Sequence, residues 1–117
     1  MAARNPDDFL PLRSTEALIL VMLSRGERHG YGIRQDVLDH SGGRMELEAG
    51  ALYRHIRHLQ ADELIEESPV AHPADDERRI YYRLTHFGRR VLAAEMLRLR
   101  ELVRLAESQR VITPARA

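Results

Sequence analysis

The stretch between residues 45 and 85 constrains the fold more than any other part of this 117-residue chain. It holds three apolar residues at intervals of four and three, the spacing of one buried helical face: Leu52, Ile56 and Leu59. Two β-prone runs follow at 64–68 and 79–84, and the residues between them are polar and include Pro73. The pattern predicts a helix over about 48–61 and then a two-stranded hairpin with a long tip.

Two further helices are expected before this stretch. Residues 17–23 are apolar almost all round, so we expect a first helix that is buried on several sides and capped by Ser14 or Thr15. After a turn at 29–32, a second helix is predicted to run to about His40. Its expected inner stripe is apolar and aromatic: Tyr31, Ile33, Val37 and Leu38.

The last predicted helix runs from His86 to about Arg110, and the hydroxyl of Thr85 is expected to cap it. Five of its apolar residues fall at intervals of 4, 3, 4 and 3, the a/d spacing of a coiled coil: Leu92, Met96, Leu99, Val103 and Ala106. A domain this small cannot easily cover such a ridge alone, and an exposed apolar ridge indicates a partner surface. We therefore predict a homodimer through these five residues.

Together these elements predict a mainly α chain with a small β-hairpin, an α+β fold of the winged helix-turn-helix type. Its order is three N-terminal helices, a two-stranded wing and a long C-terminal dimerisation helix. The length suits one folded unit. The expected divisions are a mobile N-terminal arm, a winged helix-turn-helix domain, the dimerisation helix and a short tail: 1–13, 14–84, 85–110 and 111–117.

The third predicted helix carries charged side chains opposite its apolar face. Arg54, Arg57 and His58 project from that side, and Ala51 and Tyr53 flank it on the two edges. An α-helix fits the major groove of DNA, where arginine can pair with guanine and other groups hold phosphate. We predict that these five residues contact DNA; the competing interpretation is a solvated outer surface.

The predicted wing adds a second basic group. Arg78 and Arg79 lie where the second strand leaves the hairpin tip, so we expect them to reach phosphate or the minor groove beside the helix. Helix, wing and dimer ridge together favour DNA binding over a merely solvated surface.

The charge balance favours a different partner. The net charge is zero, from 18 arginines and 18 acidic residues, whereas DNA-binding surfaces are usually basic. Residues 25–58 hold six arginines against five acids, residues 59–84 three against seven, and residues 85–117 seven against three. DNA contact must therefore depend on local geometry more than on the overall field. The alternative prediction is a winged-helix module that binds another protein and no DNA.

Other classes of function lack their signatures. The absence of cysteine excludes disulfides and thiolate metal sites. His55 and His58 stand three residues apart, but no third ligand has a convincing spacing, so no metal or cofactor is predicted. No nucleophile and no phosphate-holding glycine loop stand in a recognisable setting, so no enzyme is predicted. No apolar run reaches membrane length and residues 1–13 lack a signal-peptide core, so we expect a cytoplasmic protein without membrane contact.

A series of short motifs runs through the chain: His29-Gly30-Tyr31-Gly32-Ile33, Gly42-Gly43-Arg44, Gly50-Ala51-Leu52-Tyr53, Leu59 with Leu64-Ile65-Glu66, and Tyr81-Tyr82-Arg83-Leu84-Thr85 with Gly88-Arg89. In this order, and over roughly residues 10–106, the series resembles the PadR family of transcriptional regulators. The short single C-terminal helix resembles the compact branch of that family. The resemblance implies a winged helix, a dimer through the last helix, and repression from a palindromic operator in double-stranded DNA.

The resemblance also implies roles for single residues. Tyr53 matches a tyrosine that contacts the DNA backbone, and Arg79 matches a basic wing residue. Ala51 and Arg54 occupy recognition-helix positions at which relatives often have threonine and proline, and Ile80 stands where a basic residue is common. These departures leave the operator sequence open.

Some members of that family bind aromatic or drug-like ligands at the dimer centre and then release DNA. This chain has no tryptophan and two phenylalanines, Phe9 and Phe87. A stacking pocket is therefore not predicted, and the existence and identity of a small-molecule effector stay open.

Overall fold

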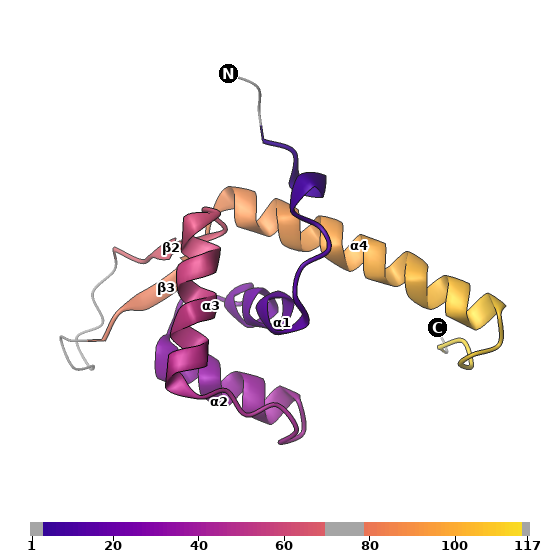
Figure 1. Cartoon of the computed structure of the whole chain (residues 1–117), viewed down its shortest axis with the longest axis horizontal. Helices are drawn as coiled ribbons and strands as arrows, with labels where there is room; N and C mark the ends of the chain where they lie inside the picture. Colours follow the sequence, from indigo (N-terminus) through magenta and orange to yellow (C-terminus); the bar gives the residue numbers. More distant parts are fainter. Residues whose placement is uncertain (1–3, 70–78, 116–117) are drawn as a thin grey trace.

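The computed structural model describes residues 4–69 and 79–115. Within them the elements follow the order η1 (Pro6–Phe9), α1 (Ser14–Leu23), β1 (Arg28–His29), α2 (Gly30–His40), α3 (Ala49–Ala61), β2 (Ile65–Glu67), β3 (Tyr81–Leu84) and α4 (His86–Ser108). Figure 1 shows α1, α2 and α3 grouped with the strands, while α4 passes this group and extends beyond it. The predicted class, mainly α with a small sheet, is confirmed.

Helix α1 lies in the core because its apolar side chains point in several directions. Its buried apolar residues, as predicted for a helix covered on several sides, are Ala17, Ile19, Leu20, Met22 and Leu23. The predicted cap is wrong: the N-cap is Arg13, which makes no side-chain cap bond, and Ser14 is already the first helical residue. The hydroxyl of Thr15 instead lies 3.9 Å from the sulfur of Met45.

Helix α2 begins earlier than predicted because His29 caps it. The Nδ1 atom of His29 accepts a hydrogen bond from the amide of Gly32 at 3.0 Å, so the predicted turn is the first turn of the helix. Ile33 and Val37 are buried one turn apart, as predicted. The predicted inward position of Tyr31 is wrong, since its side chain is 62% exposed. Two residues along a helix rotate a side chain by roughly 200°, which turns Tyr31 away from Ile33.

The sheet has three strands in the order β1-β3-β2. The predicted hairpin is confirmed, because β2 and β3 pair antiparallel with Ile65 opposite Leu84. Strand β1 pairs on the other side of β3 and was not predicted, since two residues are too few to show an alternating pattern. Tyr82 is buried and Tyr81 half-buried, as expected for strand neighbours on opposite faces. Residues 70–78, most of the predicted tip, lie outside the described residues.

A close junction joins α4 to the base of the wing. The hydroxyl of Thr85 caps α4 as predicted: it accepts from the amide of Gly88 at 2.8 Å and donates to the carbonyl of Glu63 at 2.7 Å. A Cβ atom on Gly88 would lie 1.8 Å from the carbonyl oxygen of Leu64. Glycine therefore permits an approach that any side chain would block, and this contact sets the direction in which α4 leaves the wing.

The segment predicted to be a mobile arm packs on α4 over its described residues. The rings of Phe9 and Phe87 meet edge to face with their centroids 5.3 Å apart. The amide of Leu12 donates to Oε2 of Glu95 at 2.7 Å. The mobility of the arm and the predicted domain divisions stay predictions.

Glu95 is a buried carboxylate beneath this arm, with 1% of its surface exposed. Its Oε1 accepts from Nε of Arg98 at 2.5 Å. This hydrogen bond is the main cause that lowers the pKa of the Glu95 carboxyl; burial opposes it, and the Leu12 amide adds to the lowering. Glu95 thus ties the arm to α4 in its ionised form.

The outer half of α4 carries exposed apolar side chains: Leu97, Leu102, Val103 and Leu105. Figure 1 shows that this half extends beyond the group formed by the other helices. No helix in the described ranges has both the length and the apolar character needed to cross a bilayer.

Candidate nucleic-acid interface

Helix α3 has the two faces that its sequence predicts. Its buried face packs on the core through Leu52, Ile56 and Leu59, each at most 1% exposed. Tyr53, Arg54 and Arg57 are exposed. The helix is therefore fixed from behind by apolar contacts and is free to present an aromatic and two guanidinium groups outward.

Tyr53 has a defined seat on the first residue of α2. A Cβ atom on Gly30 would lie 2.8 Å from the Tyr53 hydroxyl and 3.3 Å from its Cζ atom. The tyrosine ring therefore rests against a backbone that has no side chain, and 42% of the residue stays exposed. Gly30, which belongs to the 29–33 motif, therefore leaves room for the Tyr53 ring, a role that the sequence alone did not reveal.

A small hollow of about 180 Å³ separates α3 from the wing. Its lining brings together predicted and unpredicted residues: His29, Gly30, Tyr31, Tyr53, Arg79, Ile80 and Tyr82. Burial raises the pKa of the Tyr82 phenol, and the neighbouring Tyr53 and Glu67 add to the rise. The structure thus places Tyr53 and Arg79, predicted from separate patterns, on one hollow.

The wing side of this hollow is aromatic as well as basic. Nη1 of Arg79 lies 3.1 Å from Nε2 of His29, and the His29 ring meets Tyr81 edge to face at 5.2 Å. Tyr31 stacks on His29 at a centroid distance of 6.4 Å, and both Tyr31 and Ile80 are exposed. The sequence patterns did not indicate that Tyr31 is exposed or that the half-buried His29 lines this hollow. Recognising His29 as the N-cap of α2 would have predicted the outward direction of Tyr31.

His58 is exposed on α3, as the sequence predicts, but its ring is also held by two acidic side chains. Its Nδ1 atom lies 2.8 Å from Oε1 of Glu16, and its Nε2 atom lies 3.6 Å from Oδ2 of Asp62. The other oxygen of Glu16 lies 2.8 Å from Nδ1 of His55. Glu16 was missed because a single acid in an apolar helix gives no sign of its partner.

Two more predicted contacts have different outcomes. Ala51 is half-buried at the edge of α3, so its methyl group is partly accessible beside the exposed face. Arg78 lies outside the described residues. In the described part of the chain, no group of three or more histidine, cysteine or acidic side chains is arranged to hold a metal ion.

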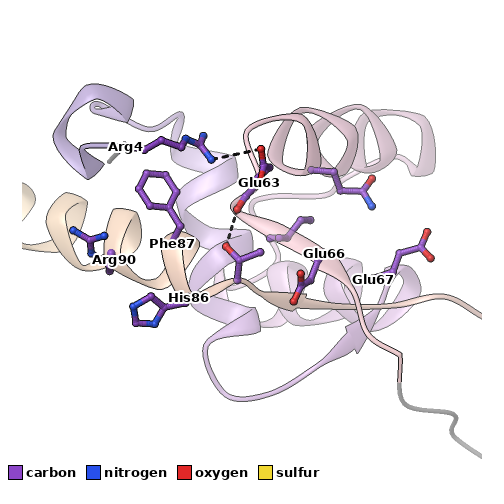
Figure 2. Close-up of a pocket in the computed structure, with 10 residues that line it drawn as sticks. Arg4, Glu63, Glu66, Glu67, His86, Phe87 and Arg90 are labelled. Atoms are coloured by element: carbon purple, nitrogen blue, oxygen red, sulfur yellow. Dashed lines mark hydrogen bonds and ion pairs between the residues drawn. The ribbon is translucent and has the colours of Figure 1, made fainter. Parts of the chain in front are cut away.

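The far end of α3 borders a larger open hollow of about 720 Å³ (Figure 2). Figure 2 shows Glu66 and Glu67 on one side and His86, Phe87 and Arg90 on the other. Glu66 is paired with Arg83 at 3.0 Å. The hollow includes none of the predicted DNA-contact residues, and its acidic side would repel phosphate.

The predicted dimer residues divide into two groups. Leu92 is 7% exposed and belongs to the core of its own chain. Met96, Leu99 and Ala106 are half-buried, and Val103 is 46% exposed. The accessible part of the predicted ridge is thus on the outer half of α4.

A helix that packs by an apolar face, follows a second helix and precedes a wing is the arrangement of the winged helix-turn-helix fold. Residues 19–94 match the family described as the transcriptional regulator PadR-like family. The chain belongs to this family, as its motifs predict.

Solved structures with the same fold include transcriptional regulators. The PadR-like transcriptional regulator of Bacillus cereus has a TM-score of 0.69 at 22% identity, over 80% of this chain and 88% of that chain. Bacillus subtilis PadR, solved in complex with operator DNA, has a TM-score of 0.61 at 21% identity, over 72% of this chain and 47% of that chain. A curated relative, uncharacterized protein X of Lysinibacillus sphaericus, is 27% identical over 78 residues, which are 67% of this chain and 71% of that protein.

Proposed function

We propose that this protein is a dimeric, cytoplasmic transcriptional repressor that binds a two-fold symmetric DNA operator. The observation that carries the proposal is the exposed face of α3, with Tyr53, Arg54 and Arg57, beside Arg79, which stands just before β3 on the tip side of the wing. An α-helix fits the major groove, where an arginine fork pairs with guanine. Tyr53 and Arg79 then hold the flanking phosphates, which fixes the register of the helix on the duplex.

The dimer in this proposal forms through the outer half of α4. Val103 is an exposed apolar residue of the ridge with coiled-coil spacing, and the exposed Leu102 stands next to it in the chain. A second copy packed on this ridge would remove the ridge from water and place two α3 helices on one side of the DNA. Two-fold proteins of this class bind half-sites roughly 34 Å apart, one turn of the duplex.

The test is footprinting of the purified protein on the DNA upstream of its own gene, at two salt concentrations. We expect a protected two-fold site whose affinity falls steeply with salt, because each phosphate contact releases counterions. No protection at either concentration would overturn the proposal. It would favour the protein-binding alternative, which the zero net charge supports.

Two variants make the test specific to the reading face. Arg57→Ala removes an exposed guanidinium from α3 and should weaken operator binding by about tenfold, the effect of losing one good base contact. Arg100→Ala removes an exposed guanidinium from α4 and should leave operator binding unchanged. Equal effects of both variants would indicate general charge attraction and not a reading helix.

A further inference from the structure

One buried carboxylate of α1 contacts two histidines of α3. Glu16 is 1% exposed. Its Oε2 atom lies 2.8 Å from Nδ1 of His55, and its Oε1 atom lies 2.8 Å from Nδ1 of His58. Both oxygens of a fixed core residue are therefore used by consecutive turns of the DNA-reading helix.

This arrangement determines where the hydrogen sits on each ring. An ionised carboxylate only accepts hydrogen bonds, so Nδ1 of both histidines must carry a hydrogen. That holds for the neutral and the charged imidazole alike, because the charged ring has a hydrogen on each nitrogen. In the neutral ring, Nε2 is then a bare acceptor. The contact that His58 can make with DNA is limited to its Nε2 atom, which lies 3.6 Å from Oδ2 of Asp62.

The same contacts restrict the rotation of α3 about its own axis. Apolar packing of Leu52, Ile56 and Leu59 holds the helix against the core, but hydrophobic contact has no preferred direction. Hydrogen bonds are directional, and two of them one turn apart fix the helix against the side of α1. Buried ionic groups often add little stability compared with apolar residues. The main contribution of Glu16 is therefore to the orientation of α3.

We propose that Glu16 is a positioning residue for DNA recognition. It holds the hydrogen of His55 and His58 on Nδ1, and so fixes the rotation at which α3 presents its exposed face. The link between the rotation of α3 and DNA recognition rests on the proposed DNA-binding function. The positions of the two hydrogens do not depend on it.

The hydrogen positions are tested without DNA, by nitrogen NMR of protein with ¹⁵N-labelled histidine, at a pH above the ordinary titration range of imidazole. We expect an N–H type Nδ1 signal for both histidines. Glu16→Gln keeps the shape but offers one acceptor and one donor. It should leave one histidine with hydrogen on Nδ1 and move the hydrogen of the other to Nε2. A bare Nδ1 in the native protein, or no change in Glu16→Gln, would overturn the inference.

The matched control is Glu95→Gln, the same substitution at an equally buried glutamate of α4. It should leave both histidine signals as in the native protein. If Glu95→Gln shifts the hydrogens as Glu16→Gln does, the effect reports general loosening and the positioning role is wrong.

The recognition step is tested by operator affinity. Glu16→Gln should lose about tenfold in specific affinity, the scale of one misplaced base contact, while low-salt binding to unrelated DNA is retained. If Glu16→Gln does not fold, Glu16→Leu provides the test, since apolar replacement of buried ionic groups is often tolerated. If Glu16→Gln moves a histidine hydrogen to Nε2 but keeps the native operator affinity, Glu16 has no role in DNA recognition. If the native protein shows the expected Nδ1 hydrogens but binds no operator, the proposed function is overturned and the inference about the hydrogen positions stands.

Discussion

Two glycines of this chain position larger groups by having no side chain. Gly88 lets the first turn of α4 approach the carbonyl oxygen of Leu64, and Gly30 receives the hydroxyl of Tyr53. The two contacts differ in what an added methyl group would meet. At Gly88 it would meet backbone, which cannot move alone. At Gly30 it would meet the end of a side chain, which can rotate. Their alanine variants should therefore fail in different ways.

Gly88→Ala should destabilise the fold by about 2 kcal/mol or more, because relief of a backbone clash in a packed region requires shifts of whole elements. The measurement is the free energy of unfolding in urea. Gly50→Ala is the matched control in the first turn of α3, where the added Cβ would meet a side-chain atom of Arg54 at an ordinary 3.7 Å. Equal stability of the two variants would contradict the tight junction.

Gly30→Ala should leave the unfolding free energy nearly unchanged but lower operator affinity by about tenfold, the effect of losing one hydrogen bond to a charged group. The added methyl would displace Tyr53 from its seat. Gly32→Ala serves as control on the same helix, since its Cβ would meet the His29 ring at an ordinary 3.5 Å. A Gly30→Ala protein with native affinity would show that the seat of Tyr53 is unimportant for DNA binding.

At the scale of elements, the contact between the N-terminal arm and α4 should depend on pH. The folded pKa of Glu95 is lowered, chiefly by the hydrogen bond from Arg98. Its contribution to stability is therefore fully present above the ordinary carboxyl pKa and is lost as pH falls through the lowered folded pKa. Urea midpoints measured from neutral to acid pH should fall more steeply for the native protein than for Glu95→Gln. Parallel curves would remove Glu95 as the cause.

Regular elements of this chain were predictable to the extent that their patterns are local. The period of Leu52, Ile56 and Leu59 gave the orientation of α3, and the hydroxyl of Thr85 gave the start of α4. Strand β1 was missed because its pairing depends on β3, far along the chain. The link from Glu16 to His58 spans 42 positions and follows no period, so only the folded arrangement reveals it.

At the scale of the whole molecule, the proposed dimer should depend on the outer half of α4. Val103→Asp places a charge on the ridge without disturbing the core, since Val103 is 46% exposed. We expect monomers by sedimentation, and weaker operator binding because the two half-sites no longer act together. Leu97→Asp is the control, because Leu97 is also apolar and 55% exposed but lies off the a/d spacing. Dissociation by Leu97→Asp alone would place the interface on another face.

The contact of Gly88 with Leu64 has a mechanical consequence for such a dimer. The contact joins α4 rigidly to the wing, so the 23-residue helix acts as a rigid lever of roughly 34 Å. If the two α4 helices of a dimer tilted by about 10° where they cross, the α3 helix of each protomer would move by roughly 6 Å over that length. That displacement is close to two base-pair steps, about 3.4 Å each. A small change in the crossing angle of the two α4 helices would therefore displace both α3 helices from their half-sites. Side-chain packing far from the DNA would then control how well the dimer fits the operator.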